Sequence, residues 1–224
     1  LPAPENLPLT RDLQRGQTMT APGLMAFDVD GTLLRGENIC ECIARNIGRS
    51  SEMAAFERLR AREDIADGRR AMLEWYRPYS QATLIEYLRD LRLAPGVRSG
   101  FARLKSQGVK IALVSITWQF AVEWLAADLG ADYAVGTGWS PENGIAHFWP
   151  EDKATWLQTL LETLEIDQRG LVAAGDSYGD IPMLKFAGRG YFVGTDLPQD
   201  LQHVHHWPDA DISAIVEDIL QSPA

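Results

Sequence analysis

The chain has 224 residues, 46% of them hydrophobic and 23% charged, and its formal net charge is -10 at pH 7. This length allows one full core with a sizeable insertion, and the composition is that of an ordinary globular protein. The acidic balance excludes a basic face that binds nucleic acid, and no apolar run is long enough to span a membrane.

The N-terminal segment and the two cysteines are the features of the sequence that indicate the cellular location of the protein. Residues 1–20 are rich in proline and polar residues and lack the apolar centre of a signal peptide, so we expect a flexible N-terminal extension. Cys40 and Cys42 lie two apart in an expected helix and point to different faces, which predicts reduced thiols rather than a disulfide or metal site. A cytoplasmic location is the expectation that follows.

The first elements along the chain are a strand and a helical insertion. Residues 24–27 form an apolar run that Gly31 soon ends, which is typical of a short buried strand. From Glu37 to Leu93 the periodicity is helical and no strand pattern is present. We expect helices over residues 53–65, 69–76 and 81–91, with breaks at Gly68 and Pro78.

After residue 93 the pattern alternates between helices and strands. The expected helices cover residues 97–106, 119–129, 152–164 and 211–220, and a short one starts near 181. The expected strands cover residues 110–115, 171–174 and 190–193, with a hairpin from 133–135 to 144–146. This alternation predicts an α/β fold with a Rossmann-like parallel sheet sandwiched by helices. The core would comprise residues 21–35 and 94–224, and residues 36–93 would form the insertion.

Two carboxylates, Asp28 and Asp30, follow the first strand one residue apart. Chemistry in open α/β sheets gathers beyond the carboxyl ends of the strands, and strand geometry sends both side chains to one side. Two like charges so close repel each other unless a cation or a shared proton intervenes. The pair therefore predicts an aspartate nucleophile, a second aspartate as proton carrier and a hard metal ion, with a solvated loop as the alternative.

Four further polar residues lie at strand ends or helix starts. Ser115 ends an apolar run and is either a phosphate ligand or a helix cap. Lys153 lies in the first turn of a helix, where a cation gains nothing from the helix dipole. Two interpretations of this residue remain, a functional lysine and an ordinary surface lysine. Asp176 follows a buried strand and offers a metal ligand, while Asp180 is a second ligand or an N-cap.

Together these residues give the ordered set Asp-x-Asp-x-Thr, Ser, Lys and Gly-Asp-x-x-x-Asp. The set resembles the haloacid dehalogenase-like superfamily of phosphohydrolases, and within it the phosphoserine phosphatase group, over residues 24–193. The resemblance implies a small helical cap at residues 36–93 and a Mg²⁺-dependent phosphatase that hydrolyses a small phosphomonoester through an aspartyl-phosphate. A phosphotransferase to an alcohol acceptor and a non-catalytic binding protein on the same fold are the alternatives.

The resemblance also implies a role for each residue. Asp28 would be the nucleophile, and Asp30 would protonate the leaving alcohol and then deprotonate the hydrolytic water. Ser115 and Lys153 would hold the phosphoryl oxygens. The Mg²⁺ ligands would be Asp28, the backbone carbonyl of Asp30, Asp176 and, through water or by orienting the others, Asp180.

The expected partner is a small phosphorylated metabolite rather than a nucleic acid or a membrane. Glu37 lies at the position where this group has a cap glutamate that binds the ammonium group of the substrate. The chain departs from the group at three places. After Ser115 it has Ile116 and Thr117 where the group has Gly-Gly, and it has Gly179 where the group has Asn. Met72 lies near the register of the group's cap arginine, and Arg69 and Arg70 are offset from it. These departures predict a phosphomonoester larger than phosphoserine, and Trp118, Phe148 and Trp149 are expected at the mouth of the site.

Overall fold

The computed structural model describes residues 22–140 and 142–221. The extension expected at residues 1–20, and Pro141 in the expected hairpin turn, lie outside these ranges. Within the described part of the chain, no helix combines the length and the apolar character needed to cross a membrane.

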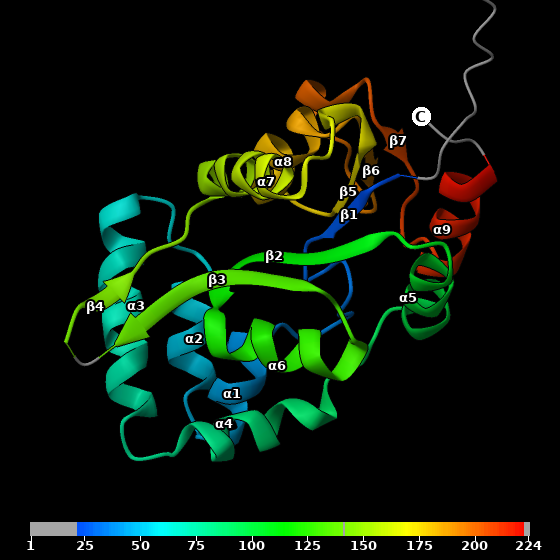
Figure 1. Cartoon of the computed structure of the whole chain (residues 1–224). Helices are drawn as coiled ribbons and strands as arrows, with labels where there is room; N and C mark the ends of the chain where they lie inside the picture. The colour runs from blue at the N-terminus through cyan, green and yellow to red at the C-terminus, as the bar shows by residue number, and fades with distance from the viewer. Residues whose placement is uncertain (1–21, 141, 222–224) are drawn as a thin grey trace, which may run out of the picture.

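A sheet with β1 near its centre organises the fold (Figure 1). Within residues 22–140 and 142–221 it has seven strands in the order β4-β3-β2-β1-β5-β6-β7, all parallel except for the β3–β4 pairing. In chain order they are β1 (Leu24–Phe27), β2 (Lys110–Trp118), β3 (Tyr133–Ser140), β4 (Gly144–Ala146), β5 (Leu171–Gly175), β6 (Arg189–Phe192) and β7 (His205–His206). Every residue of β1 and β5 is buried, as expected for strands that are covered on both faces.

Helices cover both faces of this sheet, as the alternating pattern predicts. The helices of the core are α5 (Val97–Ser106), α6 (Gln119–Leu129), α7 (Pro150–Leu164), α8 (Ile181–Phe186) and α9 (Ile212–Gln221). Met25 and Phe27 pack on the side of α5, α6 and α9, whereas Leu24 and Ala26 pack on the side of α7 and α8. The period of two along β1 therefore assigns its side chains to two separate apolar layers.

The chain between β1 and α5 forms a separate group of helices, which we call the cap segment (residues 36–93). Its elements are α1 (Ile39–Asn46), α2 (Ser50–Phe56), α3 (Arg62–Tyr76), α4 (Gln81–Tyr87) and the 3₁₀ turn Leu88–Asp90. The cap segment joins the core where residues 33–35 and 92–94 lie side by side; we call these residues the stem, which includes the last two residues of the cap segment. The Arg35 N–H donates to the Arg92 carbonyl at 2.9 Å, and the Ala94 N–H donates to the Leu33 carbonyl at 2.8 Å.

The expected helix over residues 53–65 and the expected break at Gly68 are wrong. Helix α2 ends at Phe56 and α3 begins at Arg62, so that Gly68 lies inside α3. A Cβ atom on Gly68 would lie 2.4 Å from the ring of Phe56. The glycine is therefore there to let α2 pack closely against α3 and not to end a helix.

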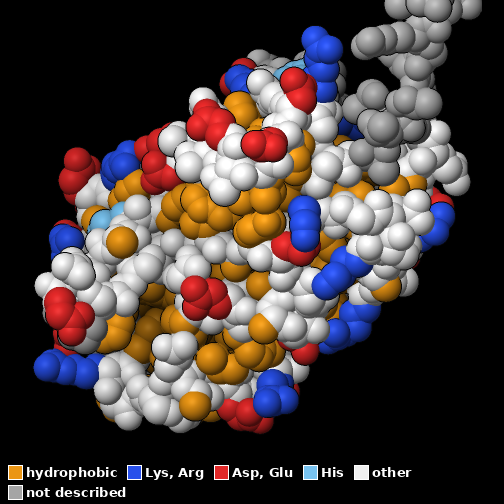
Figure 2. Space-filling model, viewed as in Figure 1, with side chains coloured by type: hydrophobic (Ala, Val, Ile, Leu, Met, Phe, Trp, Pro, Cys, Tyr) orange, Lys and Arg blue, Asp and Glu red, His pale blue; other side chains and the backbone are white. Residues whose placement is uncertain are grey.

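A groove of about 1080 Å³ opens beside α3, α6 and β3, and Figure 2 shows hydrophobic side chains gathered in a hollow there. It shares Trp118 and Thr137 with a smaller cavity of about 330 Å³ that lies between the cap segment and the ends of β1 and β2. The smaller cavity is lined by Asp28, Asp30, Ser115 and Lys153, four of the residues that the sequence singles out.

Candidate active site

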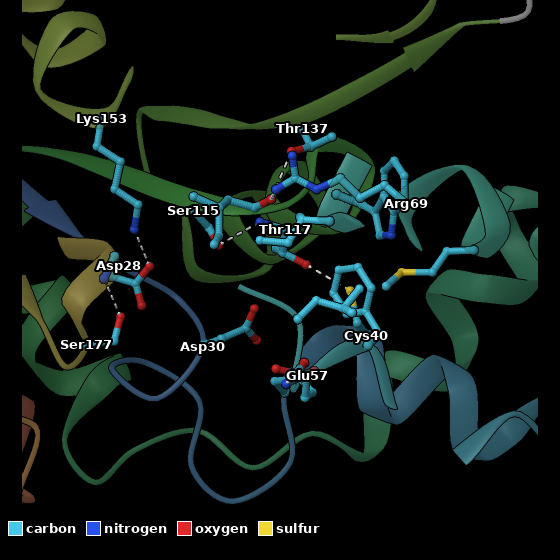
Figure 3. Close-up of a pocket in the computed structure, with 18 of the residues that line it drawn as sticks. Asp28, Asp30, Cys40, Glu57, Arg69, Ser115, Thr117, Thr137, Lys153 and Ser177 are labelled. Atoms are coloured by element: carbon cyan, nitrogen blue, oxygen red, sulfur yellow. Dashed lines mark hydrogen bonds and ion pairs between the residues drawn. The ribbon is translucent and has the colours of Figure 1, made fainter. Parts of the chain in front are cut away.

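The predicted polar residues come together at the carboxyl ends of the parallel strands. The chain leaves β1 at Asp28 and β5 at Asp176, while Ser115 lies in β2 and Lys153 in the first turn of α7. The 330 Å³ cavity is lined by Asp28, Asp30, Ser115 and Lys153, which face one another in Figure 3. The parallel topology produces this meeting because strands β2, β1 and β5 are neighbours in the sheet.

Lys153 lies at the base of the cavity between two carboxylates. Its Nζ is 2.7 Å from Asp28 Oδ1 and 2.6 Å from Asp180 Oδ1, and all three side chains are at most 7% exposed. Burial disfavours the ammonium, but Asp180 and Asp28 together raise the pKa of Lys153 above its ordinary value. Burial raises the pKa of Asp28, repulsion from Asp180 adds to this, and Lys153 opposes it.

The second oxygen of Asp180 holds the loop after β5. Asp180 Oδ2 accepts from the backbone N–H groups of Asp176 and Ser177, both at 3.0 Å, and from Ser177 Oγ at 3.1 Å. Asp180 is at the N-cap position of α8, but its side chain makes no capping bond to that helix and instead caps the preceding turn and contacts Lys153. Its part as a second metal ligand stays a prediction. The Thr32 hydroxyl donates to Asp176 Oδ1 at 3.2 Å and orients that carboxylate.

Three carboxylates converge in a way that fits a hard divalent cation. One oxygen from each of Asp28, Asp176 and Asp180 lies within 4.8 Å of the others. Lys153 neutralises only one of the three charges, and burial with Asp180 repulsion raises the pKa of Asp176 to about 6. Gly31 allows the Asp176 carboxylate to lie against the loop after β1, because a Cβ atom there would lie 2.1 Å from Asp176 Oδ2 and its φ is +87°. Oxygen donors with excess negative charge suit Mg²⁺.

Asp30 lies beside this cluster and faces the cap segment (Figure 3). Its Oδ1 accepts from the backbone N–H of Ile39 at 2.9 Å, at the start of α1. Burial raises the pKa of Asp30 to about 7, although the Ile39 N–H opposes the rise. A carboxyl with this pKa can both donate and accept a proton near neutral pH.

Ser115 lies in an irregular part of β2. Val114 pairs with Val135 and Trp118 pairs with Thr137, so β2 contains two more residues than β3 over this stretch. This bulge carries Ser115, Ile116 and Thr117, and the Thr117 N–H donates to Ser115 Oγ at 3.2 Å. Bulges re-aim side chains next to active sites, and this one places the buried Ser115 on the cavity wall.

Glu37 lies outside the cavity wall. Its carboxylate is paired with Arg45, whose Nε and Nη2 lie 2.9 and 3.0 Å away, and Glu37 is not among the residues that line the cavity. The acidic cap residue on the wall is Glu57, which accepts from Asn38 Nδ2 at 3.0 Å. A part of Glu37 in substrate recognition stays a prediction from the resemblance and gains no support from this geometry.

The remaining cap residues on the wall are mostly apolar. Met72 is buried and lines the cavity together with Phe56, Leu59 and Ile65. Of the three aromatic residues expected at the mouth, Trp118 lines the cavity, while Phe148 and Trp149 do not. The cap side of the wall therefore combines these apolar side chains with two arginines, Arg60 and Arg69.

Arg69 lies on the cavity wall, although it is offset from the register of the family's cap arginine. It is only 5% exposed and lines the cavity beside Thr137 (Figure 3). Arg69, Met72 and Tyr76 are the buried residues of α3, and their spacing of three and four puts them on one face. This spacing is the signal in the sequence that could have identified Arg69 as an inward-facing residue.

Comparisons with known proteins identify the family of the chain. Residues 25–185 match the family model described as haloacid dehalogenase-like hydrolase. The phosphoserine phosphatases of Albidiferax ferrireducens and a Polaromonas species are 31% and 32% identical to the chain over 180 residues, which is 74% of this chain and 76% of each relative. A substrate-bound phosphoserine phosphatase complex superimposes with a TM-score of 0.73 at 20% identity, covering 88% of this chain and 97% of that one. At this identity the structural match supports the fold alone.

Proposed function

The chain belongs to the haloacid dehalogenase-like hydrolase family, and we propose that it is a Mg²⁺-dependent phosphatase that hydrolyses a small phosphomonoester through an aspartyl-phosphate. The observation that carries the proposal is the buried Lys153 ammonium between Asp28 and Asp180, with Asp30 on the same cavity. Relatives that are named phosphoserine phosphatases support the same class of reaction.

In the first half of the reaction, a carboxylate oxygen of Asp28 attacks the phosphorus atom and the bond from phosphorus to the alcohol oxygen breaks. Asp30 donates its proton to that oxygen, so the product leaves as a neutral alcohol. Lys153 and Ser115 hold the equatorial oxygens, which keeps the phosphoryl group in line with the attacking carboxylate.

In the second half, Asp30 is a carboxylate and takes a proton from water, whose oxygen attacks the same phosphorus atom. The bond from phosphorus to Asp28 breaks, which releases inorganic phosphate and returns both aspartates to their starting states. A Mg²⁺ ion held by Asp28, Asp176 and the backbone carbonyl of Asp30 would supply charge neutralisation for the phosphoryl oxygens. Asp180 keeps the Asp176 loop in place throughout.

We further propose that the alcohol part of the substrate is larger than serine. The cavity of about 330 Å³ has Phe56, Leu59, Ile65 and Met72 on its cap side, where the family resemblance implies an arginine at the register of Met72. This apolar part of the wall gains free energy from covering carbon atoms and gives nothing to a carboxylate. Arg60 and Arg69 also line the cap side, but their guanidinium groups donate to backbone carbonyls.

Metal removal tests the reaction class. With para-nitrophenyl phosphate and Mg²⁺, we expect steady release of inorganic phosphate, and we expect EDTA to lower the rate by at least about 100-fold because the carboxylates then repel the phosphoryl group. Adding excess Mg²⁺ should restore the rate, and adding Na⁺ at equal ionic strength is the control. An equal rate with and without EDTA would contradict the metal dependence.

A substrate panel tests the leaving group. We expect phosphomonoesters with a bulky apolar alcohol, such as naphthyl phosphate, to exceed phosphoserine in kcat/KM by about tenfold or more, since burying a few carbon groups suffices for this factor. The variant Met72→Arg should shift the preference towards phosphoserine. If phosphoserine proves the best substrate of the wild type by a wide margin, the size argument is wrong.

A further inference from the structure

Arg69 crosses from the cap segment to the core. Its Nη2 donates to the carbonyl of Ile116 at 2.9 Å and to that of Phe148 at 3.3 Å, and its Nη1 lies 3.1 Å from His147 Nδ1. These polar partners, all among the described residues, are neutral groups. Burial lowers the pKa of Arg69 to about 10, which leaves the guanidinium charged at neutral pH. A buried cation is thus directed at backbone carbonyls of the core.

The first of these carbonyls belongs to the bulge that carries Ser115. Ile116 is the next residue, and its carbonyl also accepts from Thr137 Oγ1 at 2.9 Å. One donor to this carbonyl therefore comes from the core strand β3 and the other from the cap helix α3. Because the bulge lacks regular pairing with β3, it is held by these two donors, by the 3.4 Å contact of Cys40 with Thr117 and by the Thr117 N–H bond to Ser115 Oγ.

The second carbonyl belongs to the segment that leads to Lys153. Phe148 precedes Trp149, the N-cap residue of α7, and Lys153 is the fourth residue of that helix. The guanidinium carbon of Arg69 also lies 4.6 Å from the centre of the Trp149 ring, a cation–π distance. The same side chain thus holds the entrance to α7.

We propose that Arg69 is a positioning residue that aligns Ser115 and Lys153 on the phosphoryl group when the cap segment lies against the core. This role rests on the proposed phosphatase function. Arg69 acts through the Ile116 carbonyl on one side and through Phe148 and Trp149 on the other. Thr137 Oγ1 contacts the same two carbonyls from the core, at 2.9 and 3.5 Å, so Arg69 adds a tie from the cap segment to two segments that the core already joins.

The first experiment compares Arg69→Met with Arg69→Lys and with the control Arg62→Met. Arg62 also stacks on Trp149, at 4.3 Å, and pairs with Glu151, but it is exposed and contacts neither carbonyl. Binding of inorganic phosphate in the presence of Mg²⁺ is measured by calorimetry, and turnover with para-nitrophenyl phosphate. We expect Arg69→Met to weaken phosphate binding about tenfold and to lower kcat/KM about 100-fold, because small misplacements cost this much.

The conservative variant Arg69→Lys should show smaller losses in phosphate binding and in kcat/KM than Arg69→Met. An ammonium keeps the positive charge but lacks the planar fork of donors that spans the two carbonyls. Arg62→Met should stay within about twofold of the wild type. A role in stability alone would lower the thermal midpoint of Arg69→Met and leave phosphate affinity unchanged, which would overturn the proposal. If Arg69→Met does not fold, Arg69→Lys carries the same comparison.

A double variant shows whether Arg69 acts through Ser115. In the Ser115→Ala background, we expect Arg69→Met to weaken phosphate binding by less than about threefold, because residues that act as a unit are not additive. Full tenfold effects in both backgrounds would overturn the coupling. A wild type with no phosphatase activity would contradict the proposed function, whereas Arg69-dependent phosphate binding would still support the positioning role.

Discussion

Replacing Asp28 by Asn is expected to remove turnover of para-nitrophenyl phosphate, with a loss of at least about 1000-fold in kcat, because the amide cannot form the covalent intermediate. The amide keeps the shape of the side chain and can still contact Lys153 at the position of the 2.7 Å bond. The rate is measured as inorganic phosphate released in the presence of Mg²⁺. The same substitution at the exposed Asp64 in α3, Asp64→Asn, is the matched control and should leave the rate unchanged.

Two further observations make this result specific to the nucleophile. The Asp28→Asn protein should unfold in urea with the same slope as the wild type, which shows an intact fold. It should also retain binding of inorganic phosphate, because Ser115 and Lys153 remain in place. Turnover by Asp28→Asn at the rate of the wild type would contradict the assignment of Asp28 as the nucleophile.

Replacing Lys153 by Met is expected to lower both stability and activity. The ammonium is 2% exposed, and its removal leaves Asp28 and Asp180 buried without their shared cation. Breaking a buried ion pair by removing one partner costs about 3–5 kcal/mol, and we expect a loss of this size in the free energy of unfolding without metal. Turnover should fall together with it, since the phosphoryl oxygens lose a cation.

The control for Lys153 is an exposed pair of the same type. Lys185 contacts Asp200 at 3.1 Å, with both side chains largely in solvent. Lys185→Met should cost no more than about 1 kcal/mol, the upper value for surface pairs. Adding Asp180→Asn to Lys153→Met should recover part of the lost stability by removing one of the two repelling charges. If Lys153→Met and Lys185→Met have the same urea midpoint, the proposed stabilisation by the buried Lys153 is wrong.

Much of the fold and of the site follows from local signals in the sequence. The carboxyl ends of apolar runs place Asp28, Ser115 and Asp176 at one edge of the sheet, because parallel strands that are neighbours end together. The helices over residues 97–106 and 119–129 have the predicted bounds, because apolar periodicity and the following glycine define them well. These signals depend only on residues close together along the chain.

The features that the sequence did not predict depend on contacts between distant segments. The continuation of β2 through its bulge to Trp118 depends on pairing with β3 and on Gly136, where a Cβ atom would lie 2.7 Å from the Thr117 carbonyl. The spacing of Arg69 with Met72 and Tyr76 indicates an inward face, but its contacts with Ile116 and Phe148 depend on how α3 packs on the core. Glu37 matches a family position in the linear sequence, but Arg45, eight residues later, pairs with its carboxylate.

The stem has a consequence for how this enzyme can diversify. Leu34 and Leu93 pair directly, so the chain leaves the core and re-enters it at one place. The cap segment is thus an insertion whose ends are already joined, and exchanging it would leave the hydrogen bonds of β1 with β2 and β5 untouched. An exchanged insertion would then keep the core residues of the site, provided that it supplies the N–H bond of Ile39 to Asp30 and the Arg69 contacts to Ile116 and Phe148.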